Sequence, residues 1–179
     1  IPSEFEYLSW PEVKNISKDK RSTIIWPFGA VEQHGPHLPL ATDSIFVDEI
    51  IGEVLKLIPK ETPLKKLPTQ YIGFSPEHKG FDGTISLSSN LMTLMIKEVG
   101  AQLSDMGFKR LILINGHGGQ ISLINTAARE LRDIAPKLSI FPCFLWSGVD
   151  GLGDLLTKKE IENGLHASLA ETSLMMALK

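Results

Sequence analysis

The chain contains one cysteine, Cys143, among its 179 residues, which excludes an intrachain disulfide. It also lacks any Cys-x-x-Cys pair, so neither a thiolate zinc site nor a dithiol redox centre is expected. Chains with so little cysteine are typical of reducing compartments, and we therefore expect a cytoplasmic protein. We further expect Cys143, which follows a short apolar run, to be a buried and inert thiol.

Long apolar segments and an excess of one charge are also missing. No stretch approaches the roughly 18 apolar residues that a membrane helix needs. The first residues lack the basic and apolar regions of a signal peptide. Lysine and arginine number 18, and aspartate and glutamate number 21, which gives a formal net charge of −3. This balance argues against nucleic acid or an anionic membrane surface as a partner.

The overall composition is that of a compact globular domain. Hydrophobic residues make up 42% of the chain and charged residues 22%, so residues 1–179 are expected to form a single domain with a substantial core. The sequence begins without methionine and ends inside an apolar pattern that has no stop signal. We therefore expect both ends to be incomplete, the C-terminal end in particular.

Apolar periodicity predicts an alternation of strands and helices. Strands are expected at residues 22–27, 84–87, 111–114 and 138–141, and helices at residues 43–58, 89–106 and 121–135. Asp43 or Ser44 is expected to cap the first helix. Ser88 or Ser89 is expected to cap the second, which Gly107 ends in a left-handed conformation. This alternation predicts one α/β domain built around a mostly parallel sheet.

The densest group of polar side chains follows the first predicted strand. Glu32 and His34 are two residues apart, so in an extended segment their side chains leave the same face. Asp43 comes after a proline-rich bend, in which His37 is expected to order the turn. Carboxylates together with imidazoles suit zinc, manganese or iron. Loops at the carboxyl ends of parallel strands line ligand crevices, and the pattern therefore predicts a metal site there.

Two further groups follow later in the chain. Asn115 and His117 directly follow the strand expected at residues 111–114, and the glycines at 116, 118 and 119 let the backbone approach whatever His117 touches. His166 stands at the entrance of a helix expected near residue 165, where Glu171 points inward as a ligand or base. Glu77 and His78 lie in a long loop and are candidates for substrate contact.

These groups carry a family resemblance. The sequence resembles the creatininase (creatinine amidohydrolase) family in ordered motifs at residues 27–29, 32–35, 38–43, 115–119, 166–167 and 171–173. Residues 81–86 resemble the family's Phe-Pro-Gly-Thr-Ile-Ser segment, with Asp82 in place of its proline. The match runs from about residue 24 to residue 177, and several ordered motifs together are far more specific than any one of them.

The resemblance implies a three-layer α/β/α sandwich that binds two divalent metal ions, which can be zinc, manganese or iron. It also implies an enzyme that hydrolyses an amide-type carbon–nitrogen bond of a small molecule. It also implies a homohexamer. Carried over by position, Glu32 and His117 hold one metal, His34 holds the second, and Asp43 bridges both. His166 keeps the position of the family's catalytic histidine and is the expected proton donor to the amine leaving group.

Two departures from creatininase proper bear on the substrate. Where that enzyme has Asn-Gly-His-Tyr-Glu, this chain has Gly118 and Gly119, so the second metal needs another carboxylate, which Glu171 is expected to supply. Asn115 and the amides of the two glycines are expected to hydrogen-bond the substrate. The Trp-Asp pair before the catalytic histidine is replaced at residues 162–163. Creatinine is therefore not the expected substrate, and relatives that deformylate a formamidopyrimidine or trim a peptide look at least as close.

Two other hypotheses stay open from the sequence. The loop at residues 116–119 could hold a small anion at a helix N-terminus in a protein that is not an enzyme, although it lacks the lysine and hydroxyl of a P-loop. A structural subunit with a decayed site is the other hypothesis. The intact set of carboxylates and histidines described above argues against decay, and a metal-dependent amidohydrolase is the leading interpretation.

Overall fold

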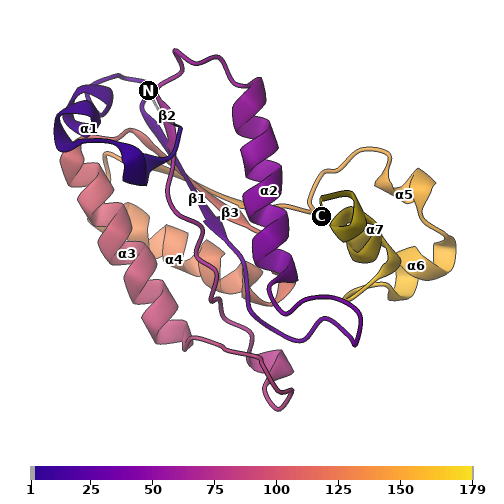
Figure 1. Ribbon diagram of the computed structural model, residues 1–179. Helices are drawn as coiled ribbons and strands as arrows, with labels where there is room; N and C mark the ends of the chain where they lie inside the picture. The colour runs from indigo at the N-terminus through magenta and orange to yellow at the C-terminus, as the bar shows by residue number, and fades with distance from the viewer. Residues whose placement is uncertain (1–2, 179) are drawn as a thin grey trace.

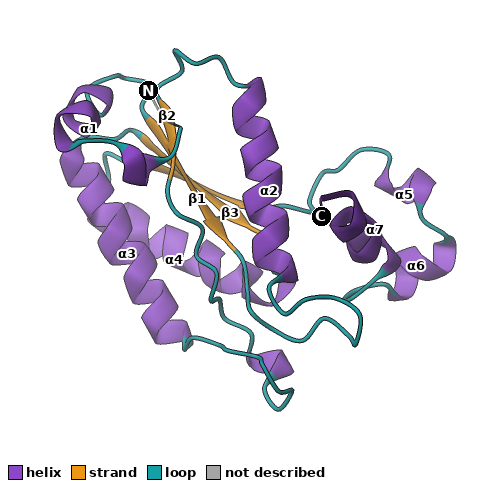
Figure 2. Ribbon diagram, viewed as in Figure 1, coloured by secondary structure: helices purple, strands orange, loops and turns teal. Residues whose placement is uncertain are grey.

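A computed structural model describes residues 3–178, and four parallel strands form its central sheet (Figure 1, Figure 2). The strands are β1 (Thr23–Phe28), β2 (Leu64–Lys66), β3 (Arg110–Asn115) and β4 (Ser139–Phe144), in the spatial order β2-β1-β3-β4. β1 pairs with β3 in register from Thr23 opposite Arg110 to Phe28 opposite Asn115. All six residues of β1 are buried, as expected for a strand with neighbours on both edges and helices on both faces.

Helices cover both faces of the sheet, which confirms the predicted α/β/α sandwich (Figure 2). On one face, α2 (Thr42–Leu57) packs Val47 and Ile51 against Ile25 of β1. On the other face, α3 (Ser89–Met106) and α4 (Ile121–Ile134) pack against each other and against the opposite side chains of β1 and β3. Alternate residues of each strand therefore enter two different cores.

The strand order explains why the helices are divided between the faces. The chain moves outward from β1 to β2, then crosses back to β3 and continues to β4. Crossover connections between parallel strands are right-handed, so a reversal of direction in the sheet moves the connecting helix to the opposite face. The chain segments that leave the carboxyl ends of the adjacent strands β1 and β3 consequently lead to helices on opposite faces of the sheet. This is the switch point, where such sheets bind ligands.

The remaining elements of the described chain are helical. They are η1 (Phe5–Tyr7), α1 (Trp10–Ile16), η2 (Pro76–His78), η3 (Gly118–Gln120), α5 (Leu152–Leu155), α6 (Lys158–Asn163) and α7 (Leu169–Leu178). α7 contacts α2, and α5 and α6 project beside it (Figure 1). Within residues 3–178, no helix is both long and apolar enough to cross a membrane.

Several local expectations hold in the structure. Ser88 is the N-cap of α3, and its hydroxyl accepts a hydrogen bond from the amide of Leu91 at 3.2 Å. Gly107 ends this helix with φ +102°, a backbone conformation that side chains with a Cβ rarely adopt. Three of the expected strands are present as β1, β3 and β4, and the three expected helices are present as α2, α3 and α4.

Other expectations were wrong. Residues 84–87 form no strand, since Ile85 makes only an isolated bridge to Val31. β2 lies in a proline-broken segment that periodicity did not identify. Ala41, not Asp43 or Ser44, precedes the first turn of α2. The Ser44 hydroxyl instead donates to the carbonyls of residues 30 and 71, which ties the helix to the loop after β1.

Cys143 also differs from the expectation. It lies within β4, not after it, and its side chain is exposed instead of buried. Among the described strands, β4 pairs with β3 alone. Its alternate residues Phe141 and Cys143 pair with Ile112 and Ile114 of β3 and therefore lie on the α2 face of the sheet. α2 packs over β1 on this face, which leaves the thiol on the edge strand exposed.

Candidate metal centre

The carboxyl ends of β1 and β3 bring the first two predicted groups together. Glu32 and His34 stand on the loop after β1, Asp43 on the first turn of α2, and His117 two residues after β3. All four side chains are nearly or fully buried, with exposed fractions of 0 to 4%. Residues that are more than 70 positions apart in sequence thus converge because their strands are adjacent in the sheet.

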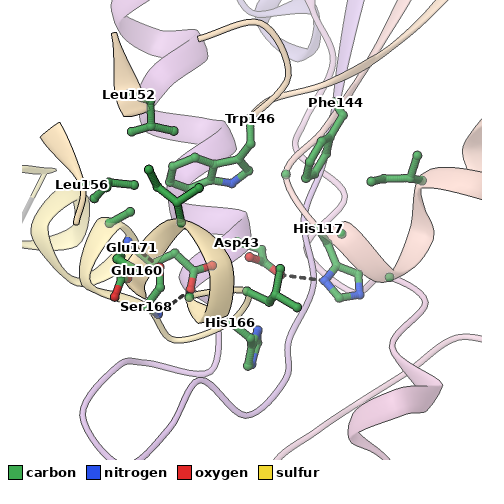
Figure 3. Close-up of a pocket in the computed structure, with 18 of the residues that line it drawn as sticks. Asp43, His117, Phe144, Trp146, Leu152, Leu156, Glu160, His166, Ser168 and Glu171 are labelled. Carbon is green, nitrogen blue, oxygen red and sulfur yellow. Dashed lines mark hydrogen bonds and ion pairs between the residues drawn. The ribbon is translucent and has the colours of Figure 1, made fainter. Parts of the chain in front are cut away.

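Asp43 lies between two histidines. Its Oδ1 is 3.3 Å from Nε2 of His34. Its Oδ2 is 3.0 Å from Nδ1 of His117 (Figure 3). Each carboxylate oxygen therefore faces a different imidazole. A carboxylate in this position would be able to hold a cation through either oxygen.

Glu32 is the fully buried carboxylate of the same cluster. Its Oε1 is 3.1 Å from Nδ1 of His117 and 3.9 Å from Nδ1 of His166. Its Oε2 is 3.9 Å from Nε2 of His78. One fully buried carboxylate is thus surrounded by three imidazoles from three different loops.

Three buried carboxylate oxygens in the described chain accept no hydrogen bond: both oxygens of Glu32 and Oδ2 of Asp43. Leaving buried carboxylates unpartnered costs several kcal/mol, and buried charges in proteins are normally paired or bound to metal. The single hydrogen that Nδ1 of His117 can carry does not satisfy three oxygens. Cations among these oxygens would remove the deficit, so the residues present fit a metal centre.

The candidate ligand atoms fall into overlapping groups, each with atoms within 4.8 Å of one another. The groups are Glu32, His34 and His166; Glu32, Glu77 and His117; and His34, Asp43 and Glu171. Four carboxylates and three imidazoles make up these groups, and such a mixed set suits zinc, manganese and iron better than an ion such as calcium that prefers oxygen ligands alone. The last two groups share no residue, and Asp43 lies beside both.

Electrostatics within the cluster are strongly coupled. Burial disfavours the charged imidazole of His117, but contacts with Asp43 and Glu32 outweigh burial and raise its pKa to about 10. Burial likewise disfavours the charged carboxylate of Asp43, yet His117 and His34 lower its pKa to about 2. The pKa of His34 is raised because Asp43 outweighs the opposing effect of burial. In metal-free protein a proton on His117 therefore compensates part of the negative charge.

Backbone and side-chain acceptors orient the histidines. Nδ1 of His34 lies 3.2 Å from the backbone oxygen of Glu32, which leaves Nε2 facing Asp43. Nε2 of His117 lies 3.0 Å from Oε1 of Glu77 and 3.2 Å from the hydroxyl of Ser75. Ligand histidines usually donate their second ring nitrogen to a carboxylate or hydroxyl in this way.

The third predicted group closes the site from the C-terminal segment. His166 precedes α7, and its Nε2 lies 2.6 Å from the backbone oxygen of Gln33. The rings of His34 and His166 have centroids 4.3 Å apart. Glu171 is buried in the first turn of α7, where its Oε2 accepts a hydrogen bond from the amide of Ser168 at 3.0 Å (Figure 3).

The candidates for substrate contact divide into two sets. Glu77, His78, Gly118 and Gly119 line a cavity of about 600 Å³ in front of the cluster, as do His166 and Glu171. Asn115 does not line it. Its amide donates to the backbone oxygen of His117 at 2.8 Å, and its carbonyl accepts from the amide nitrogen of His117 at 3.0 Å. Asn115 therefore shapes the loop that carries His117.

Some residues near the cluster were not identified from the sequence. Ser75 is fully buried beside His117, and nothing in its neighbours marks it. Phe144 and Trp146 form one wall of the cavity. His37 was expected to order its own turn, but its Nε2 lies 3.0 Å from the hydroxyl of Thr172 in α7.

Fold and site together define an α/β/α protein with a buried carboxylate–histidine centre at a topological switch point. The chain belongs to the creatininase family, because the family model described as creatinine amidohydrolase matches residues 6–179. This confirms the resemblance on which the site residues were first aligned.

The individual relatives are named for different reactions. The chain is 34% identical over 122 residues to the mycofactocin precursor peptide peptidase of Mycolicibacterium smegmatis, which covers 67% of this chain and 49% of that protein. It is 27% identical to the creatinine amidohydrolase of Pseudomonas putida, with 96% of this chain and 70% of that protein covered. The chain thus spans about half the length of the peptidases it matches.

Solved creatininase structures share the fold. A manganese form superposes with a TM-score of 0.81 at 25% identity, covering 99% of this chain and 73% of that chain. A mutant described as a zinc–zinc type matches with the same score, identity and coverage. Solved structures with this fold thus include one described as a manganese form and one described as a zinc–zinc type.

Proposed function

We propose that this chain is a metal-dependent hydrolase that cleaves an amide-type carbon–nitrogen bond with water. The observation that supports it best is the position of Asp43, whose two oxygens face His34 and His117 separately. The unpartnered oxygens of Glu32 add the negative charge that two divalent cations would balance. Membership of a family that contains hydrolases supports the same reaction class.

Each proposed ligand has a geometric reason. Glu32 and His117 would hold one ion, and His34 and Glu171 the other, with Asp43 between them. Gly119 offers no carboxylate to the second ion. Glu171 can replace it because its ligand atom lies within 4.8 Å of those of His34 and Asp43.

Bound divalent ions would lower the pKa of water from about 15.7 towards 7 and polarise the scissile carbonyl. In this proposal His166 transfers the proton. Nε2 of His166 donates its hydrogen to the backbone oxygen of Gln33, so Nδ1, which lies 3.9 Å from Oε1 of Glu32, is the ring nitrogen that can exchange a proton within the site. Nδ1 can accept the proton of the attacking water and deliver it to the departing amine nitrogen.

Glu77 and Ser75 have a supporting role in this proposal. Their oxygens lie 3.0 and 3.2 Å from Nε2 of His117, and Nδ1 of the same ring faces Asp43 and Glu32. The amides of Gly118 and Gly119 and the ring of His78 line the cavity, where they can contact the substrate. The hexameric assembly expected from the family stays a prediction.

The substrate class can be either a small amide or formamide or the end of a peptide. The second alternative is favoured by the mycofactocin precursor peptide peptidases, which are 33 to 34% identical to the chain, against 27% for the creatinine amidohydrolase. A non-enzymatic anion-binding role is disfavoured, because the carboxylates of Glu77, Asp43 and Glu171 line the cavity beside the loop at residues 116–119.

Metal content tests the proposal. Protein purified without chelator or histidine tag should contain close to two equivalents of zinc, manganese or iron by mass spectrometry. Asp43→Asn should reduce this to one equivalent or less, whereas Asp133→Asn, on the exposed end of α4, should leave it unchanged. If wild-type protein takes up no metal after incubation with all three ions, the hydrolase proposal for this chain is wrong.

A further inference from the structure

The cavity in front of the cluster has an unusual distribution of charge. Four carboxylates line it: Asp43, Glu77, Glu160 and Glu171. No lysine or arginine of the described chain is among its lining residues. Two bound divalent ions would balance the carboxylates at the inner end. Glu160 lies outside the proposed ligand set, so it would keep its negative charge towards whatever enters.

The wall opposite the histidines is apolar. Phe144 at the end of β4, Trp146 after it, and Leu152 and Leu156 in and after α5 belong to this wall (Figure 3). Ile161 of α6 and Leu165 after it also line the cavity. The ring of Trp146 meets Phe46 of α2 edge-on, with centroids 5.9 Å apart, which holds the indole against the cavity. Apolar and aromatic walls with few polar groups are typical of sites that bind an organic ligand.

We propose that the substrate of this site carries an aromatic or bulky aliphatic group next to the scissile amide, and that this group bears no negative charge. The apolar group lies on the wall formed by Phe144 and Trp146, while the amide reaches the metal cluster. A neutral or cationic substituent faces Glu160. The proposal rests on the proposed function, because it assumes that the metal cluster is where the amide binds.

The dimensions of the cavity support an apolar substituent. A cavity of about 600 Å³ lies within the range that encloses a drug-sized ligand. A small amide placed at the metals would leave the wall of Phe144, Trp146 and Leu152 in contact with water. Covering that wall with substrate removes apolar surface from water on both sides, which strengthens binding.

The position of Glu160 determines the sign of the selectivity. Its Oε1 accepts a hydrogen bond from the amide of Leu169 at 2.6 Å, which fixes the carboxylate at the wall between α6 and α7. The backbone oxygen of the same residue accepts from the amide of Gly164 at 2.7 Å. With no described cation lining the cavity, a substrate carboxylate or phosphate placed there would be repelled.

Hydroxamates allow metal binding to be measured separately from recognition of the substituent. The hydroxamate group binds the metal, and the group attached to it can be varied. Acetohydroxamate, benzohydroxamate and its 4-carboxamide and 4-carboxylate derivatives should be titrated into metal-loaded protein by calorimetry. Benzohydroxamate should bind at least about tenfold more tightly than acetohydroxamate, equivalent to about 1.4 kcal/mol. The carboxylate should bind about fivefold more weakly than the carboxamide, and added salt should reduce this difference.

Variants assign these effects to the wall. Trp146→Ala should remove most of the advantage of benzohydroxamate without changing the affinity for acetohydroxamate. Trp10→Ala, at an exposed position of α1, should change neither affinity. Glu160→Gln should bring the carboxylate within about twofold of the carboxamide, because the repelling charge is gone.

The outcomes distinguish failure of this inference from failure of the proposed function. If acetohydroxamate binds but the aromatic ring adds nothing, or the carboxylate binds best, the inference is overturned and the metal centre stands. If no hydroxamate binds, a metal-independent pair decides: N-benzylformamide should quench Trp146 fluorescence saturably, and 4-(formamidomethyl)benzoate should not. Equal quenching by both, or by neither, overturns the inference in that case, with Trp146→Phe as the control for the signal.

Discussion

Gly119 and Glu77 occupy one space at the edge of the cluster. A Cβ atom at position 119 would overlap Oε1 of Glu77 and would lie 2.6 Å from Nε2 of His117. The Glu77 carboxylate can therefore reach His117 only because residue 119 has no side chain. The departure from the creatininase motif at Gly119 and the contact between Glu77 and His117 are two parts of one arrangement.

Gly119→Ala should consequently weaken metal binding. The new methyl group displaces Glu77 from His117, and loss of such a supporting contact typically costs 10- to 100-fold in metal affinity. Competition with a chromogenic chelator measures this affinity directly. Gly118→Ala is the matched control, since a Cβ there meets nothing within 4 Å. Equal affinities for the two variants would show that Glu77 does not support His117.

Metal binding should release a proton from His117. The pKa of this imidazole is about 10 in the metal-free protein, so near pH 7 an incoming ion must displace a proton. Affinity should rise about tenfold per pH unit from neutrality and level off as the pH approaches 10. Calorimetry in two buffers of different ionisation enthalpy should detect about one proton released by the ion at His117. Heats that do not depend on the buffer would contradict the prediction.

The same shift sets the pH dependence of stability without metal. The pKa of His117 rises from its ordinary 6.5 to about 10, so its contribution to the free energy of unfolding is fully present below pH 6.5. It is lost as the pH rises through about 10. Urea unfolding of chelator-treated protein at pH 6 and pH 10 should show the decrease, and His117→Gln should reduce the difference.

Glu32→Gln should separate stability from metal binding. In metal-free protein both oxygens of Glu32 are buried without a hydrogen bond, and the protonated His117 beside them is shared with Asp43. Removing the charge of Glu32 therefore relieves a cost of about 1–3 kcal/mol. The variant should therefore unfold at higher urea concentration than wild type in the presence of chelator, but lose metal affinity. Glu98→Gln, at an exposed position of α3, controls for a general change of charge. A destabilised metal-free variant would mean that the carboxylate is already compensated.

Gly100 and Gly52 offer a paired test of the packing. A Cβ at Gly100 would collide with the side chain of Leu131 where α3 meets α4, so Gly100→Ala should destabilise the fold by about 1–3 kcal/mol. Gly52 lies within α2 with nothing within 4 Å of a new Cβ, and Gly52→Ala should stabilise it by up to about 1 kcal/mol. Thermal unfolding of both variants measures the two effects, and an equal shift in the same direction would contradict the packing described.

The sequence predicted those features that depend on neighbouring residues. The ends of α3 follow from Ser88 and Gly107, which act through hydrogen bonds and backbone conformation within one turn. β1 and β3 are apolar runs whose character does not depend on their partners. Residues 84–87 have the same alternation, but no strand lies beside them, and only Ile85 forms a bridge.

Features that depend on contacts across the fold were not predictable in the same way. Periodicity offered Asp43 only as a cap of α2, whereas the family resemblance grouped it with His117 as a metal ligand. Its carboxylate does face His117, a residue that the crossover to β3 brings to it. Ser75 and Glu77 contact His117 through a loop whose path follows no periodicity. The resemblance to a family supplied the candidate ligands, whereas their distances required the fold.

The adjacency of β1 and β3 has a consequence for the order in which the protein is made. Glu32, His34 and Asp43 leave the ribosome long before His117, which joins them only after β3 has been inserted beside β1. A nascent chain that ends before β3 carries part of the ligand set on an unfinished sheet. Tight metal uptake should therefore mark completion of the sheet, and an ion bound by such a fragment should exchange rapidly.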